Sequence, residues 1–466
     1  MRKMFARLVE VKIKNGKSVA SGNIVFNDVK KFNPEELSSY PTVFGIYGQN
    51  RSGKSTAVEA IAIAHDLISG RKASLINNGF ITEWENLCEC SYVFIIQTSA
   101  NSFWKYEYSI TFKKNDNDDS DRPYVLEHES LIVKSCFRNE NGTSWKNIIP
   151  AIGVSFSSPK SIFDEVQYKK RFSKIESLGE TKTLSKNDLK SFLFSKEFIG
   201  GCSKTHQDKL ARVLTVLKEY CTFDLFVFSN DESSLAMINY ISLCDRNETD
   251  NEIGAGKIRI DIHQVSEISS ERYEIIERCI EDMNVVLPSI ITNFQLTHKN
   301  RGEYTNDKGV LMTKFEVFSV VGGVEIPLRC ESAGVKKIVA ICSVLIDVFN
   351  DPSVCLVVDE MDSGVFEYLL GQIIKVFDNY AKGQIVFTAH NSRALECLPT
   401  KQIIFTTTNP NKKYIRLKKV KPTNNLRDFY FRAIVLGGQD EELYNATSES
   451  KIAKSFGFLR RKSNDK

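Results

Sequence analysis

An apolar segment near the N-terminus runs directly into two glycines and then into a helical pattern. Residues 42–47 are almost all apolar, which predicts a short buried strand. Gly48 and Gly53 follow with four residues between them, and Lys54 and Ser55 come next. Apolar side chains then recur at helical spacing until a further glycine ends the pattern. A strand, a glycine-rich loop and a helix in this order predict a phosphate-binding loop.

The chemistry of such a loop follows from its residue types. The glycines let the backbone curl so that successive N–H groups face a phosphate, and the helix N-terminus adds a partial positive charge. Lys54 would reach the β- and γ-phosphates, and the Ser55 hydroxyl would ligate Mg²⁺. We therefore expect ATP and Mg²⁺ as cofactors. The expected ATP-binding residues are Gly48, Asn50, Arg51, Ser52, Gly53, Lys54, Ser55 and Thr56.

An acidic pair follows a second apolar run about three hundred residues downstream. Residues 354–358 predict a buried strand that ends at Asp359 and Glu360. An aspartate at this position can hold Mg²⁺, and an adjacent glutamate can polarise an attacking water. The alternative is structural, because Asp359 or Asp362 could instead cap the helix predicted after it.

Two further segments flank the acidic pair. Upstream, apolar spacing predicts an amphipathic helix whose N-terminus carries Ser332, Ala333 and Gly334, so that a hydroxyl and free amides lie at its positive end. Downstream, residues 383–389 predict another buried strand, which ends at His390. A histidine at a strand end is usually an ordinary polar residue, but this strand follows the acidic one and would place His390 beside a γ-phosphate.

The order of these motifs resembles that of ABC-type ATPases, specifically the SMC-like and OLD-like branch, over residues 1–90 and 310–410. The resemblance implies an α/β fold: an ATPase head with a mixed or parallel sheet and a flanking β-meander, interrupted by a helix-rich insertion. It also implies composite ATP sites between two copies of the chain. By this resemblance Ser332, Ala333 and Gly334 bind the partner copy's ATP, Asp359 and Ser55 hold Mg²⁺, Lys54 and Glu360 are catalytic with Glu360 as the base, and His390 senses the γ-phosphate.

The sequence departs from the family pattern at several positions. Glu331 precedes the signature serine, Ala333 stands where a glycine is usual, and residues 361–364 are not the common small apolar loop. The glutamine that would complete the Mg²⁺ shell has two candidates, Gln97 and Gln167. These departures favour slow, switch-like hydrolysis over a fast motor.

A chain of 466 residues is long enough for more than one core, and its patterns divide it into four segments. The insertion lacks the sustained heptads of a long coiled coil, so we expect a short arm or lid. The expected segments are 1–155 (first half of the head, with the phosphate-binding loop), 156–305 (insertion), 306–420 (second half of the head) and 421–466 (C-terminal helix and basic tail).

The distribution of charge bears on whether the chain contacts nucleic acid. Residues 401–466 hold fifteen Lys and Arg against six Asp and Glu, so this end could meet nucleic acid, although a solvated surface is an equal reading. The basic residues 168–174 could likewise contact nucleic acid or form a solvated helix face.

Eleven scattered cysteines indicate reduced thiols in a cytoplasmic protein, and Cys88 with Cys90 lacks the second pair of a zinc site. No apolar run reaches the length of about 20 residues that a membrane span needs.

The predicted ATPase head ends about fifty residues before the end of the sequence, whereas a nuclease domain of the topoisomerase–primase (TOPRIM) type would need well over about a hundred. We therefore expect an effector on a separate chain. In its size, its short insertion and residues 359–370 and 436–445, the sequence looks most like the ATPase subunits (AriA) of the PARIS anti-phage systems. That resemblance implies a homo-oligomeric scaffold that holds a TOPRIM-type nuclease and releases it when a phage-encoded trigger protein appears. The alternative is an SMC-like repair or recombination ATPase that clamps duplex DNA; a small-molecule kinase fits poorly, because residues 332–334 and His390 would have no task.

Overall fold

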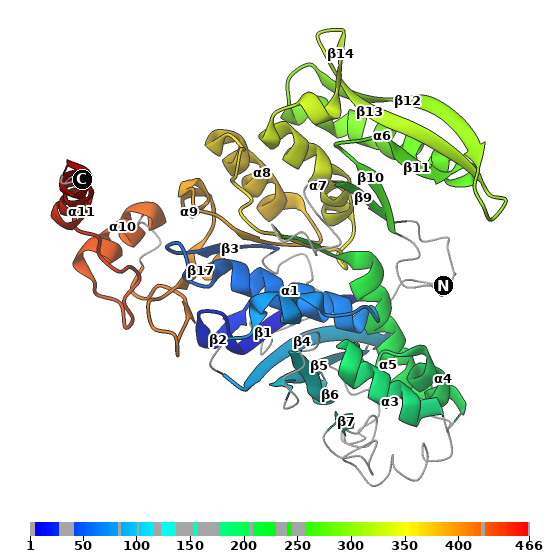
Figure 1. The fold of residues 1–466 in the computed structure, drawn as a ribbon, viewed down its shortest axis with the longest axis horizontal. Helices are drawn as coiled ribbons and strands as arrows, with labels where there is room; N and C mark the ends of the chain where they lie inside the picture. Colours follow the sequence, from blue (N-terminus) through cyan, green and yellow to red (C-terminus); the bar gives the residue numbers. More distant parts are fainter. Residues whose placement is uncertain are drawn as a thin grey trace.

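The computed structural model describes eleven stretches of the chain, and the account below concerns these alone (Figure 1). They are residues 5–27, 42–82, 85–99, 102–115, 123–136, 152–156, 177–204, 208–229, 240–244, 257–420 and 425–464.

A six-stranded central sheet carries the predicted motifs at its strand ends. Its strands are β3 (Val43–Tyr47), β8 (Leu225–Phe228), β15 (Cys355–Val358), β16 (Gln384–Thr388), β17 (Ile403–Thr406) and β18 (Tyr414–Ile415). They lie in the order β18-β17-β3-β16-β15-β8, and all pairs are parallel except β17 with β18. Both faces of this sheet are covered, which is why its strands appear in the sequence as continuous apolar runs.

The two faces of the central sheet are covered by different elements (Figure 1). Helix α1 (Lys54–Ile68) covers one face and belongs to a core shared with an antiparallel sheet. The other face packs against α7 (Ala333–Asn350), α8 (Glu367–Tyr380), α9 (Arg393–Cys397) and α10 (Leu426–Leu436). Successive residues of each strand alternate between these two cores, as the geometry of a strand requires.

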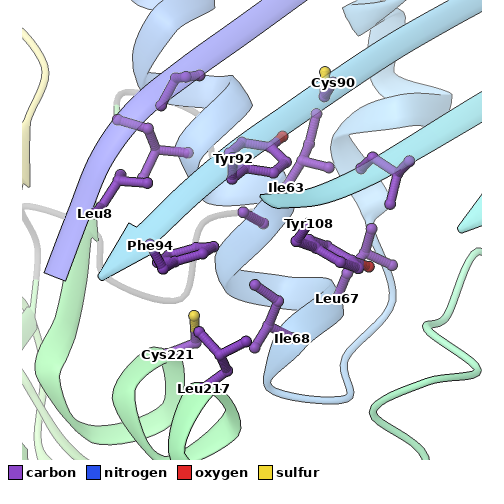
Figure 2. Packing of buried hydrophobic residues seen from close by; sticks show 14 of the residues in the cluster. Leu8, Ile63, Leu67, Ile68, Cys90, Tyr92, Phe94, Tyr108, Leu217 and Cys221 are labelled. Atoms are coloured by element: carbon purple, nitrogen blue, oxygen red, sulfur yellow. The ribbon is translucent and has the colours of Figure 1, made fainter. Parts of the chain in front are cut away.

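The antiparallel sheet is the β-meander expected beside the phosphate-binding loop. It contains β1 (Ala6–Gly16), β2 (Val19–Val25), β4 (Leu87–Ser99), β5 (Ser102–Lys114), β6 (Tyr124–Cys136) and β7 (Ile152–Ser155) in the order β2-β1-β4-β5-β6-β7. Helix α1 lies between the two sheets, where Ile63, Leu67 and Ile68 pack against Tyr92 and Tyr108 of the meander (Figure 2). The short turn Ile76–Phe80 follows α1.

A group of helices is attached to this sheet through one buried carboxylate. The helices are α3 (Ser177–Asp188), α4 (Lys196–Lys204) and α5 (Asp208–Glu219), which leads through the turn Tyr220–Asp224 into β8. The carboxylate of Glu129 in β6 accepts hydrogen bonds from Tyr108 Oη (2.7 Å), the Ser191 hydroxyl, and the backbone N–H groups of Phe192 (2.9 Å) and Leu193 (3.2 Å). The segment between α3 and α4 is thus fixed to the sheet.

A third unit lies beside α7, on the side away from α1 (Figure 1). Its elements are β9 (Tyr240–Cys244), β10 (Lys257–Asp261), β11 (Ser266–Ser269), α6 (Ser270–Ile290), β12 (Phe294–Thr305), β13 (Leu311–Val321) and β14 (Val324–Pro327), followed by the turn Leu328–Cys330. β9 pairs with β10, and β13 pairs with β11, β12 and β14. This unit, from β9 to β14, is here called the arm. Its core includes Ile338 and Val339 of α7, so the arm packs on the predicted signature helix.

The predicted α/β fold class is confirmed, with a mostly parallel sheet and a flanking meander. Strand β8, in the segment 156–305 that was expected to form a separate insertion, belongs instead to the head. β8 is hydrogen-bonded to β15 along its whole length and forms one edge of the central sheet. Its four apolar residues are all buried, because a parallel edge strand under two cores buries both of its faces. The same segment also contains β9, β10, β11 and most of β12.

The C-terminal elements lie at the opposite end of the central sheet from the arm (Figure 1). α10 is joined to α11 (Glu449–Asn464) by a segment that includes residues 437–445, here called the strap. The short turn Thr400–Gln402 precedes β17. In the part of the chain described, no helix combines the length and apolar character needed to cross a bilayer.

Candidate functional site

The predicted phosphate-binding loop connects β3, an inner strand of the parallel sheet, to the first turn of α1. Gly53 is the N-cap of α1 with a left-handed φ of 96°, a conformation that glycine adopts without strain. Lys54 is buried and its Nζ donates hydrogen bonds to the carbonyl oxygens of Gly48 and Gln49, both at 2.9 Å. The loop therefore curls around the lysine in the manner that a phosphate cradle requires.

Two residues of the β17–β18 hairpin, Thr406 and Tyr414, hold this loop, and sequence reasoning did not find them. Thr406 Oγ1 donates to Ser52 Oγ at 2.6 Å, and Tyr414 Oη donates to the Gly53 carbonyl at 2.6 Å. A Cβ atom on Gly48 would lie 1.7 Å from Thr406 Oγ1, which leaves no room for a side chain. The first glycine is thus required for close packing against the neighbouring strand.

The acidic pair lies at the end of β15, two strands from β3. Asp359 is buried and accepts a hydrogen bond from the Thr388 hydroxyl of β16, which in turn accepts one from Glu360 N at 2.7 Å. Glu360 has a φ of 49°, a conformation that non-glycine residues seldom adopt and that recurs at functional sites. Thr388 thus organises both acidic residues.

The electrostatics of Lys54 connect the two motifs. Burial lowers the pKa of the Lys54 ammonium, while Asp359, Glu360 and Asp362 act in the opposite direction. Carboxylates exert this effect only when they are near the group concerned. The structure therefore brings the phosphate-binding lysine and the acidic residues into one site.

The capping alternative for the aspartates is not what the structure contains. Helix α8 begins at Glu367 with Phe366 as its N-cap and without a side-chain cap. Asp362 instead accepts hydrogen bonds at Oδ2 from the backbone N–H groups of His390 (2.9 Å) and Asn391 (2.6 Å). Its Oδ1 is buried and makes no hydrogen bond in the described part of the chain.

His390 lies two residues beyond β16, the strand between β3 and β15. Its side chain is exposed, and its backbone N–H is held by Asp362. The parallel order of β3, β16 and β15 places the phosphate-binding loop, the histidine and the acidic pair at the same edge of the sheet. The role of His390 as a γ-phosphate sensor remains a prediction.

The signature segment, residues 332–334, forms the N-terminus of α7. Ser332 caps the helix by accepting a hydrogen bond from Val335 N at 3.3 Å, and the side chains of Ser332 and Ala333 are exposed. Gly334 is buried, and a Cβ atom there would lie 1.9 Å from the carbonyl oxygen of Gly364. This segment therefore packs directly on residues 359–364, here called the acidic loop.

Lys337, one turn further along α7, is a site residue that sequence reasoning missed. It is buried, and its Nζ donates a hydrogen bond to the Glu360 carbonyl. Burial lowers its pKa, and Asp362, Glu360 and Asp359 oppose that effect. A lysine on the apolar face of an amphipathic helix was the signal that could have found it.

The residues present fit ATP and Mg²⁺ on two observations. The cradle at Gly48 and Gly53 excludes side chains, and Ser55, half-buried in the first turn of α1, supplies a hydroxyl at the same edge of the parallel sheet as the buried carboxylate of Asp359. Hydroxyl and carboxylate oxygens are ligands that Mg²⁺ prefers. Among the described residues, no group of three or more His, Cys, Asp or Glu side chains is arranged to hold a metal ion by itself.

Other predicted candidates lie apart from this site. Gln97 lies in β4 of the antiparallel sheet opposite Phe103, while Gln167 and the basic residues 168–174 lie outside the described residues. Cys88 and Cys90 are buried on one face of β4 in the core shared with α1. The hydrogen bond with the neighbouring Cys90 thiol, and then burial, raise the pKa of Cys88, which keeps it protonated and favours packing over metal binding.

Comparisons with known proteins give structural likenesses only. No protein-family model and no curated protein matches the chain. Among solved structures it is similar to the Smc head domain of Pyrococcus furiosus bound to the C-terminal domain of ScpA (14% identity, 88% of this chain and 96% of that one, TM-score 0.41). It is also similar to the recombination mediator RecF with ATP (14%, 84% and 94%, TM-score 0.34) and the SMC head domain of Thermotoga maritima (13%, 88% and 99%, TM-score 0.35).

Proposed function

We propose that the chain is an ABC-type ATPase of the SMC-like class that binds ATP with Mg²⁺ and hydrolyses it slowly. The observation that carries the proposal is the joint site: the cradle around Lys54 and the acidic pair at β15 lie at one sheet edge and interact electrostatically. Bound ATP would supply the phosphoryl group, and Mg²⁺ would neutralise its charge.

Each residue has a distinct task in this proposal. The backbone N–H groups of residues 48–56 and the Lys54 ammonium bind the phosphates, while Ser55 and Asp359 hold Mg²⁺. Glu360 accepts a proton from the attacking water, and His390 contacts the γ-phosphate. Ser332, Ala333 and Gly334 complete the site of a second copy, which fits the exposure of Ser332 and Ala333.

We further propose a role for the chain in anti-phage defence. By the resemblance of its motifs, the chain is the homo-oligomeric ATPase scaffold of an anti-phage system of the PARIS type in the cytoplasm. ATP between subunits would hold an assembly that carries a TOPRIM-type nuclease, and a phage-encoded trigger protein would release it. The departures in residues 331–334 support switching rather than rapid turnover.

Glu360→Gln and Lys54→Ala separate binding from hydrolysis. Glu360→Gln keeps the cradle and loses the base, so nucleotide affinity stays near wild type while turnover falls by about 10²- to 10⁴-fold. Lys54→Ala loses a cation at the phosphates and weakens binding itself. Equal turnover in wild type and Glu360→Gln would reject the assignment of Glu360 as the base.

The defence role has its own test. Glu360→Gln purified with ATP from its host should retain a nuclease that the trigger protein no longer releases.

A second candidate is a DNA-clamping repair ATPase, favoured by one observation. Helix α11 is rich in basic residues, and the described side chains of Lys451 and Lys454 are exposed. This reading requires turnover stimulated by duplex DNA and binding that weakens steeply with salt. Salt-insensitive or absent DNA binding would remove it.

A further inference from the structure

Lys337 is an ammonium group placed in a buried position on a helix that is otherwise apolar on that face. Its side chain is 3% exposed, and the neighbouring α7 positions Ile338 and Val339 belong to the core of the arm. Removing a charge from water is costly unless partners compensate for it. Here the compensation comes from the Glu360 carbonyl, which accepts its hydrogen bond, and from the three carboxylates of the acidic loop.

The acceptor of this hydrogen bond is an unusual backbone position. Glu360 has a left-handed φ, and its N–H is bonded to Thr388 Oγ1 at 2.7 Å. Its carbonyl is bonded to Lys337. A non-glycine residue stays in such a conformation only when its surroundings hold it there. Thr388 of β16 and Lys337 of α7 hold it from outside the acidic loop, and within the loop the Ser363 N–H also donates to the Glu360 carbonyl at 2.9 Å.

Helix α7 contacts the acidic loop at a second point. Gly334, three residues before Lys337, lies so close to Gly364 that a Cβ atom would be 1.9 Å from the Gly364 carbonyl oxygen. The first turn of α7 therefore touches the loop near both of its ends, at Glu360 and at Gly364. A rigid helix joined to a short loop at two points moves with it as one body.

We infer that Lys337 is a positioning residue that couples the signature segment of α7 to the Glu360 carboxylate. When residues 332–334 engage the ATP of a second copy, the Lys337–Glu360 hydrogen bond passes that movement to the base and sets its position toward water. The inference rests on the proposed ATPase function and adds a regulatory connection within the same site.

The test compares Lys337→Met, which keeps the length of the side chain and loses the ammonium, with Lys218→Met. Lys218 is the matched control, because its partly buried Nζ likewise donates to a backbone carbonyl, that of Phe194 at 3.0 Å, among helices remote from the acidic loop. For Lys337→Met we expect kcat to fall by about 10- to 100-fold, since a displacement of about 1 Å in a reacting group has effects of that order. Nucleotide Kd and KM should stay within about threefold, and Lys218→Met should keep wild-type kcat.

A double variant distinguishes coupling from a general loss of structure. If Lys337 acts through Glu360, Lys337→Met combined with Glu360→Gln is no slower than Glu360→Gln alone, because residues that act as a unit are not additive. If Lys337→Met does not fold, Lys337→Gln, which retains a donor, is measured in its place. Full additivity, unchanged kcat, or a loss confined to nucleotide affinity would overturn the inference while leaving the ATPase proposal intact. A wild-type chain that neither binds nor hydrolyses ATP would overturn both.

Discussion

At the scale of single residues, the atoms that approach the backbone determine which substitutions the site tolerates. At Gly48 the limiting atom is Thr406 Oγ1, 1.7 Å from where a Cβ would stand, and the same hydroxyl holds Ser52. At Glu129 the limit is electrostatic, because a fully buried carboxylate relies on four hydrogen-bond donors. Each position yields a prediction.

Gly48→Ala should destabilise the fold by about 1–3 kcal/mol and weaken nucleotide binding, because the new methyl group displaces β17 or the loop. Adding Thr406→Ala should recover part of the stability, since the clashing hydroxyl is gone. The control is Gly200→Ala in α4, where a Cβ meets nothing within 4 Å and the change should be neutral or stabilising. Thermal unfolding and nucleotide titration measure both effects. Equal stability of Gly48→Ala and Gly200→Ala would contradict the packing argument.

Glu129→Gln should flatten the dependence of stability on pH. Burial raises the pKa of Glu129 above 4.5, although its hydrogen bonds to Ser191 and Tyr108 oppose the shift. The native state therefore holds the proton more tightly than the unfolded chain, and this stabilisation is complete below about pH 4.5 and lost as pH rises through the raised pKa.

A glutamine remains neutral throughout, so the variant should lose less unfolding free energy than wild type as the pH rises above about 4.5. Urea denaturation over that range provides the measurement. Identical slopes for the two proteins would show that Glu129 does not titrate there.

At the scale of elements, the strap shows how a C-terminal segment reaches the nucleotide site. It is held along the β17–β18 hairpin by Thr408 N–H to the Glu442 carbonyl (2.8 Å) and by Asn409 Nδ2 to Glu441 (2.9 Å). Leu443 is 3% exposed and packs in the core under α10. Beyond it, Asn445 N donates to Gln49 Oε1 in the phosphate-binding loop at 3.1 Å.

Leu443→Ala should release the strap, because Leu443 is its buried apolar anchor and the hydrogen bonds of Thr408 and Asn409 remain as weaker contacts. Truncation of a buried leucine costs about 2–5 kcal/mol. Glu441→Gln is the control and should have a smaller effect, since a glutamine still offers an oxygen to Asn409 Nδ2 and the Lys412 side chain of the lost ion pair is 53% exposed. Hydrogen exchange in residues 437–445 reports the release directly. Faster exchange in Glu441→Gln than in Leu443→Ala would reverse this ranking.

At the scale of the whole molecule, the acidic loop and the signature segment share one face with exposed apolar side chains. Phe366 and Tyr368, just after the acidic loop, are 72% and 54% exposed, and Ser332 and Ala333 are also exposed. Apolar side chains beside exposed polar groups are common where proteins associate. The arm rests on α7, so association at this face would also act on the arm.

Glu360→Gln should therefore form a larger species in the presence of ATP and Mg²⁺ than without nucleotide. Ser332→Arg in the same background should remain at the mass of the nucleotide-free protein, because a bulky cation blocks the helix end that would meet the partner's ATP. Light scattering after size-exclusion chromatography measures both masses. An identical mass with and without ATP would argue against composite sites.

Local patterns predicted a large part of this protein. The strand, glycine loop and helix around Lys54, the acidic pair after β15, the helix that begins at Ser332 and the strand before His390 all lie within short windows, where periodicity and glycine spacing suffice. The α/β fold with a mixed or parallel sheet was implied by the resemblance of the motif order, and the structure confirms it. The structure has these elements within a few residues of the predicted bounds.

Only the tertiary structure decided which distant residues meet. Thr406 and Ser52 are 354 residues apart in sequence, and Lys337 and Glu360 are 23 apart on different elements. The insertion expected over residues 156–305 likewise gives β8 to the central sheet. A sequence pattern encodes which face of an element is apolar, but the partner of a buried polar group depends on how the elements pack. The partner of Lys337, the Glu360 carbonyl, is therefore identified only in the folded chain.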